Sequence, residues 1–123
     1  MIWTLSQVAL GGAIGASLRF LAVLAAARAF GAGFPFGTFA VNVAGSFAMG
    51  ALFVILAARG STLQPFVLTG ILGGFTTFSA FSLDAVRLYE GGHAAQAAIY
   101  VAASVTLSLA ALILGAAIAR SLT

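Results

Sequence analysis

The sequence has no cysteine and no lysine, and only seven of its 123 residues are Arg, Asp or Glu. Without cysteine, disulfides, thiolate catalysis and cysteine-ligated metals are excluded. Charged residues make up 6% of the chain, whereas soluble domains carry about 25%. The five arginines form no basic cluster of the kind that binds nucleic acid. This composition excludes a soluble enzyme, a disordered chain and a nucleic-acid-binding protein, and it indicates a membrane protein.

What the sequence does have is apolar residues, 63% of the chain, gathered in four long runs. A membrane-spanning helix needs about 20 such residues. Glycine, proline and polar residues separate the runs: GAGFP at 31–35, RGST at 59–62 and EGGH at 90–93. We therefore expect an all-α integral protein of the cell membrane, with the whole chain, 1–123, forming one transmembrane domain. The expected spans are about 3–27, 37–58, 64–89 and 94–119.

The arginines are distributed evenly between the two ends of these spans. Arg59 and Arg120 fall on one side of the membrane, and Arg28 and Arg87 fall on the other. The positive-inside rule therefore assigns no orientation. Either other factors set the topology, or the chain inserts both ways. In the second case an antiparallel homodimer becomes possible.

The third span has an unusual middle, GILGGFTTFSAFS at 70–82, rich in glycine and hydroxyl residues. We expect the helix to break there. Non-helical backbone at membrane depth must be buried or line a cavity, and its free carbonyls suit a small cation. The alternative is that the glycines pack against neighbouring helices and the hydroxyls bond back to the preceding turn.

Several side chains in the spans have both a packing and a functional interpretation. Phe78 and Phe81 lie on one helical face, and they either fill the core or offer electropositive ring edges to an anion. Asn42 either bonds to another helix or donates N–H groups to a ligand. Arg19 is costly at membrane depth and is a candidate functional residue unless it reaches the interface.

The fourth span repeats hydroxyl groups at intervals of four residues, at Tyr100, Ser104 and Ser108. This stripe is either a track for a dehydrating ion or a set of interhelical hydrogen bonds. Asp84 and Arg87 are three residues apart and are expected to form an ordinary helix-end pair. No carboxylate pair, activated nucleophile, phosphate loop or metal-ligand cluster is present, so the chain is not expected to be an enzyme.

Three motifs, GGAIGASLRF at 11–20, GTFAVNVAGSF at 37–47 and GGFTTFSAFS at 73–82, closely resemble the Fluc fluoride-channel family, also called CrcB, in order and spacing. The resemblance covers essentially the whole chain. It implies four transmembrane helices with a break in the third, assembled as an antiparallel, dual-topology homodimer with two fluoride pores. The implied role is passive efflux of fluoride, which confers fluoride resistance.

The resemblance also assigns roles to individual residues. It places Arg19 near an aqueous vestibule. It implies a structural sodium ion at the dimer axis, held by backbone carbonyls around Gly73 and Thr76. The anion pathway that it implies contains Asn42, Phe78, Phe81, Tyr100, Ser104 and Ser108, with Thr38, Thr77 and Ser82 as weaker candidates.

Two other functions fit a four-span chain of this size. One is a small dual-topology multidrug exporter, but that class needs a glutamate in its first span, and here the only glutamate is Glu90, at a loop. The other is a non-conducting subunit of a larger membrane complex, which would conduct nothing when purified alone.

Overall fold

The computed structural model describes all 123 residues and is entirely helical. Four segments are long and apolar enough to cross a membrane, as the sequence predicts: Ile2–Phe30, Phe36–Ala58, Pro65–Glu90 and Ala94–Leu122. The third segment is divided into three helical pieces. The elements in chain order are α1 (Ile2–Phe30), α2 (Phe36–Ala58), the π-helix η1 (Pro65–Leu72), α3 (Gly73–Phe75), α4 (Ser79–Glu90) and α5 (Ala94–Leu122).

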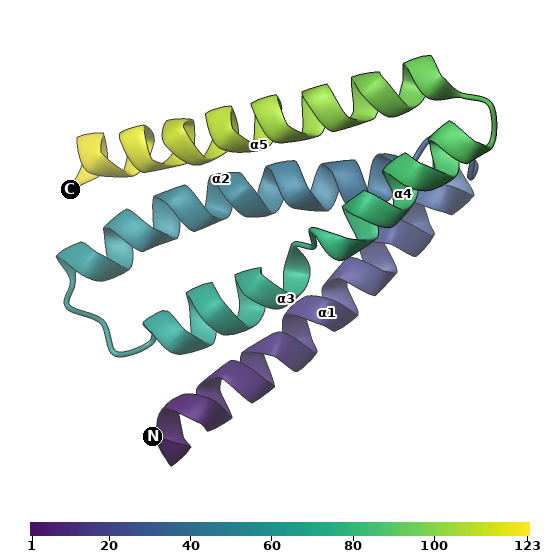
Figure 1. The fold of residues 1–123 in the computed structure, drawn as a ribbon. Coiled ribbons are helices and arrows are strands. Elements are labelled where there is room, and N and C mark those ends of the chain that lie inside the picture. The colour runs from purple at the N-terminus through teal and green to yellow at the C-terminus, as the bar shows by residue number, and fades with distance from the viewer.

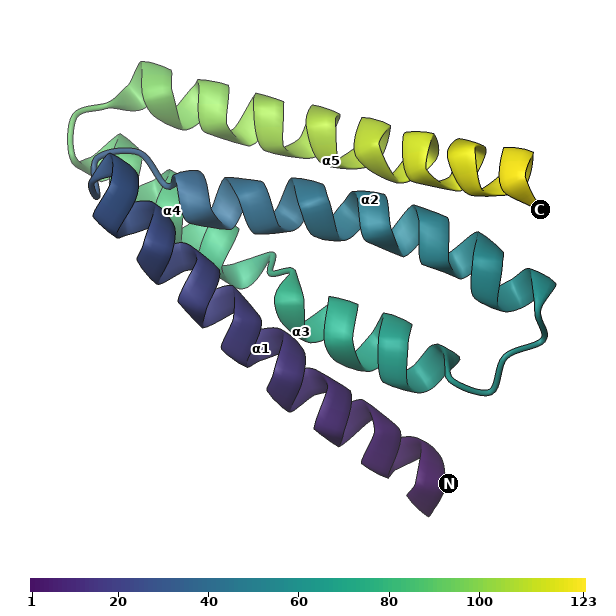
Figure 2. The ribbon, with the colours of Figure 1, turned by 180° about the vertical axis from the view of Figure 1, so that it is seen from behind.

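The two halves of the third segment pack against different partners. Helices η1 and α3 lie along α1, whereas α4 lies against α5, and α2 runs beside α5 along most of its length (Figure 1). Both termini and the connection 59–64 lie at one end of the bundle, and the connections 31–35 and 91–93 lie at the other (Figure 2). The broken segment thus bridges the α1 side and the α5 side of the bundle.

Glycines set how closely the helices approach. A Cβ atom on Gly15 would collide with the backbone carbonyl of Ile71 in η1, and a Cβ on Gly50 would collide with the carbonyl of Leu112 in α5. Small residues four apart allow such backbone contact between membrane helices. The Gly11 to Gly15 motif therefore serves packing between α1 and the third segment.

The third segment stops being helical at Thr76–Phe78. Thr76 is extended, with φ −92° and ψ 159°. The expected break is present, and it lies a few residues beyond Gly73. The π-helix before it was not predicted. Helices of this kind are rare and are often found at functional sites.

A buried aromatic cluster joins α4 to α5 at the end that carries the connections 31–35 and 91–93. Its core contains Phe81, Leu88, Ala97 and Tyr100, and Tyr100 is completely buried. The rings of Phe81 and Tyr100 lie 5.2 Å apart between centroids. This packing anchors α4 against α5 after the break.

Candidate functional site

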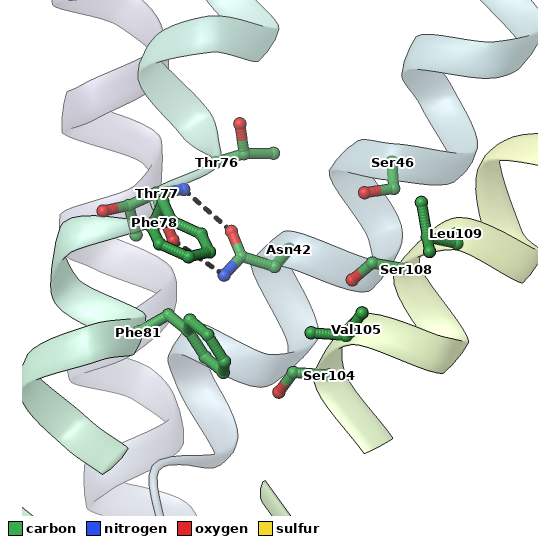
Figure 3. A pocket seen from close by; sticks show the side chains of 10 residues that line it. All are labelled: Asn42, Ser46, Thr76, Thr77, Phe78, Phe81, Ser104, Val105, Ser108 and Leu109. Atoms are coloured by element: carbon green, nitrogen blue, oxygen red, sulfur yellow. Dashed lines mark hydrogen bonds between the residues drawn. The ribbon is translucent and has the colours of Figure 1, made fainter. Parts of the chain in front are cut away.

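An open cavity of about 280 Å³ lies between α2, the break and α5. The phenylalanine rings lie on the third-segment side, and serine hydroxyls lie on the opposite side (Figure 3). No charged side chain lines it. The lining residues are Asn42, Ser46, Thr76, Thr77, Phe78, Phe81, Ser104, Val105, Ser108 and Leu109.

Asn42 of α2 holds the break through both ends of its amide (Figure 3). Its Nδ2 donates to the carbonyl oxygen of Thr77 at 2.9 Å. The N–H of Thr77 donates to Asn42 Oδ1 at 2.8 Å. Unpaired backbone groups at membrane depth each cost several kcal/mol, on the order expected for transfer to hydrocarbon. Asn42 satisfies two of them, and its second amide N–H has no hydrogen-bond partner within the chain although the residue lines the cavity.

The two threonines at the break end one helix and begin the next. Thr76 Oγ1 donates to the Leu72 carbonyl at 2.9 Å, which closes the last turn of the preceding helix. Thr77 Oγ1 accepts from the Ala80 N–H at 3.1 Å in the first turn of α4. This contact is the usual way in which a threonine caps a helix N-terminus. The Thr77 cap therefore fixes where α4 begins after the break.

Two carbonyl groups near the break are left free. Arg19 of α1 donates from Nε to the Gly74 carbonyl at 3.1 Å, and Asn42 occupies that of Thr77. The backbone carbonyls of Gly73 and Thr76 accept no hydrogen bond within the chain. Carbonyl oxygens are hard ligands suited to small cations. These two groups are therefore available to an ion or to a partner chain.

The two phenylalanines differ sharply in exposure. Phe81 is 7% exposed, whereas Phe78 is 76% exposed although it borders the cavity. Their ring centroids lie 5.5 Å apart, with the planes tilted by 52°. Phe81 thus serves both the core and the cavity wall, and Phe78 contributes to the wall alone.

The hydroxyl stripe on α5 is only partly in the cavity. Ser104 and Ser108 line it, and the buried Ser104 Oγ has no hydrogen-bond partner. Buried polar groups normally have one, so Ser104 is available to a ligand in the cavity. Tyr100 lies outside, against Phe81, and donates its hydroxyl to Asp84 Oδ2 at 3.0 Å.

Four other predicted residues also lie outside the cavity. Thr38 is buried beside a smaller hollow that Asp84 also lines. Ser82 bonds back to the Phe78 carbonyl at 2.9 Å. Arg19 lies on α1, and Gly73 lies in α3, just before the break. Neither residue lines the cavity. The structure therefore brings Asn42, Thr77, Phe78, Phe81, Ser104 and Ser108 together and leaves Tyr100, Thr38, Ser82 and Arg19 apart from them.

Two features correct or extend the sequence interpretation. Asp84 and Arg87 do not form the expected ion pair, because the Asp84 carboxylate turns inward to accept the Tyr100 hydroxyl. Ser46 lines the cavity but is not among the residues that the sequence predicted for the anion pathway. Its position one helical turn after Asn42, on the same face of α2, was the signal that could have identified it.

These observations define a class of protein: a multi-pass membrane protein whose third helix breaks beside an uncharged cavity of hydroxyls, one amide and aromatic rings. A family model described as "CrcB-like protein, Camphor Resistance (CrcB)" matches residues 6–116. The chain belongs to this family.

Relatives of this chain resemble it over almost their entire length. A protein of Cereibacter sphaeroides is 61% identical over 120 residues, which is 98% of this chain and 97% of the relative. One from Ruegeria sp. is 57% identical over 122 residues, with the same two coverages. Both are named "Fluoride-specific ion channel FluC". A Nitrobacter hamburgensis protein, "Fluoride-specific ion channel FluC 2", is 52% identical over 94% of this chain and 96% of its own.

Proposed function

We propose that this protein is a fluoride-selective ion channel that gives passive efflux of fluoride and thereby fluoride resistance. The observation that carries the proposal is the cavity at the helix break, which is lined by hydroxyl, amide and ring groups and by no charge. The names of the relatives agree with this function.

The chemistry of the cavity matches the needs of a small, strongly hydrated anion. A pore has to replace the lost water with several donors, yet a fixed charge in the path would hold the ion too tightly for it to leave. Ser104, Ser108 and the remaining Asn42 N–H offer neutral donors. The edges of Phe78 and Phe81 add positive potential without a formal charge. Such a path needs no energy source, because the ion moves down its own gradient.

We propose further that the functional unit is an antiparallel, dual-topology homodimer. The cavity is open on one side, and Phe78 projects there with 76% of its surface exposed. A second copy would close the path and cover that ring. Because the chain has no cysteine, Ser121→Cys introduces a single label site. We expect a membrane-impermeant thiol reagent to label about half of the protein in intact cells, since opposite insertions average out; labelling of all or none contradicts dual topology.

A sodium ion at the dimer axis is a related proposal. The free carbonyls of Gly73 and Thr76 fit it, because they are hard oxygen ligands. A two-fold axis would double the two carbonyls supplied by each chain. When bound, the ion would lock the two breaks against each other. If so, replacing sodium with a large organic cation should weaken dimerisation in detergent; an unchanged dimer would contradict the sodium site.

The channel proposal is tested with liposomes that contain only the purified protein. We expect rapid fluoride release, followed with a fluoride electrode, and no comparable chloride release in parallel vesicles. If the protein were instead a multidrug exporter or a non-conducting subunit, the folded, inserted protein would release no fluoride. Release of both anions at similar rates would contradict selectivity.

A further inference from the structure

A second polar hollow lies at the end of the bundle where α4 meets the connections 31–35 and 91–93. Its volume is about 300 Å³. Its walls come from Ala32, Gly33 and Pro35 on one side and from α4 and the following loop on the other. Unlike the cavity at the break, it is bordered by charged and titratable side chains: Asp84, Arg87 and His93.

The side chains of Asp84, Tyr100 and Phe81 connect this outer hollow to the wall of the inner cavity. Asp84 borders the hollow and accepts the hydroxyl of Tyr100 at 3.0 Å. Tyr100 in turn packs on Phe81, with 5.2 Å between ring centroids, and Phe81 lines the inner cavity. An anion that passed between the inner cavity and the outer hollow would therefore pass the Asp84 carboxylate.

A carboxylate beside an anion path repels the ion, and the structure offers one fixed positive charge to oppose it. Arg87 borders the same hollow without forming an ion pair with Asp84. Asp84 therefore does not neutralise the charge that Arg87 brings to the border of the hollow. The other carboxylate of the chain, Glu90, does not border the hollow, and neither does Arg28, which is exposed in the last turn of α1 at the same end.

We infer that the outer hollow is the mouth of the anion path and that Arg87 is a positioning residue that offsets the field of Asp84 there. The inference rests on the proposed channel function. The ligand of the mouth is then a small inorganic anion. The opposite charges of Asp84 and Arg87 balance each other there, and His93 is a further hydrogen-bond donor at the rim. Arg87 acts on the rate at which fluoride crosses the mouth, not on its selectivity in the inner cavity.

Fluoride efflux from liposomes containing the full-length protein tests this at two ionic strengths, because salt shortens the reach of a charge from about 30 Å at 0.01 M to about 3 Å at 1 M. At low salt, Arg87→Gln should slow efflux about threefold to tenfold, the size expected for one unit charge several ångströms away in a partly aqueous site. The loss should shrink at high salt. Arg87→Lys should conduct like the wild type, and so should the matched control Arg28→Gln.

A double-mutant cycle separates charge balance from structural damage. Because the fields of the two charges add, Arg87→Gln should slow efflux by a similar factor in the Asp84→Asn background, which keeps an oxygen to accept the Tyr100 hydroxyl. The double variant should then conduct within about twofold of the wild type. Equal rates for Arg87→Gln and the wild type would overturn the inference, as would a double variant that stays as slow as Arg87→Gln, or an equal loss at both salt concentrations. A wild-type protein that releases no fluoride would instead overturn the channel function itself.

Discussion

Replacing Phe81 with isoleucine is expected to slow fluoride efflux about tenfold or more. Isoleucine keeps an apolar side chain beside Tyr100 but removes an aromatic ring, and with it the positive ring edge, from the wall of the cavity. Aromatic ring contacts contribute up to about 1.5 kcal/mol, and about 1.4 kcal/mol corresponds to a factor of ten in rate. Initial efflux rates from liposomes at matched protein density measure the effect.

The effect on the path has to be distinguished from damage to the core, because Phe81 is only 7% exposed. Phe78→Ile provides the distinction: Phe78 borders the same cavity but is 76% exposed, so its loss removes little packing within the chain. Phe53→Ile is the matched control, since Phe53 is 54% exposed on α2 and does not line the cavity. Wild-type rates in both Phe81→Ile and Phe78→Ile would remove the rings from the anion path.

The second large effect is expected at Asn42. Asn42→Leu removes both hydrogen bonds to the Thr77 backbone and leaves an N–H and a carbonyl unpaired at membrane depth. Each unsatisfied buried group costs about 1–3 kcal/mol, so the variant should lose about 2–6 kcal/mol of stability and release no measurable fluoride. Thermal unfolding in detergent and liposome efflux measure the two losses.

Asn42→Asp tests which role of the amide matters. Aspartate still accepts the Thr77 N–H, but it loses the donor to the Thr77 carbonyl and puts a negative charge in the cavity. We expect it to be more stable than Asn42→Leu and yet to conduct no fluoride, because the charge repels the anion. Thr69→Leu, at an exposed position in the third span, to which Thr77 belongs, should retain stability and efflux. Fluoride efflux from Asn42→Leu at the wild-type rate would show that the two hydrogen bonds between Asn42 and the Thr77 backbone are not needed for conduction.

Much of the fold followed from composition. Runs of apolar residues and the punctuation between them predicted four long helices, since each span needs only a length and a lack of charge. Glycine and hydroxyl residues predicted that the third span breaks. They did not predict where the helix stops, because that depends on Thr76 and Thr77 capping opposite helix ends. The π-helix of 65–72 had no signal, since it accompanies close packing of η1 on Gly11 and Gly15.

The site was less accessible to sequence reasoning because it is built from contacts between helices. Asn42 was expected to face either a helix or a ligand, and in the structure one amide clamps Thr77 and also borders the cavity. Tyr100 belongs to the same helical stripe as Ser104, but its length carries the hydroxyl past the cavity to Asp84. Spacing along a helix identifies which residues share a face, and it does not reveal how far each side chain reaches.

The central claim is that fluoride moves passively through a neutral path, and the reversal potential of the current tests it most directly. In a planar bilayer holding the purified protein, with fluoride at different concentrations on the two sides, we expect the current to reverse at the fluoride equilibrium potential. That potential changes by about 59 mV for each tenfold gradient of a monovalent ion at 25 °C. It should not move when a chloride or a pH gradient is added. A reversal potential that follows chloride or pH, or the absence of any fluoride current, would contradict the account.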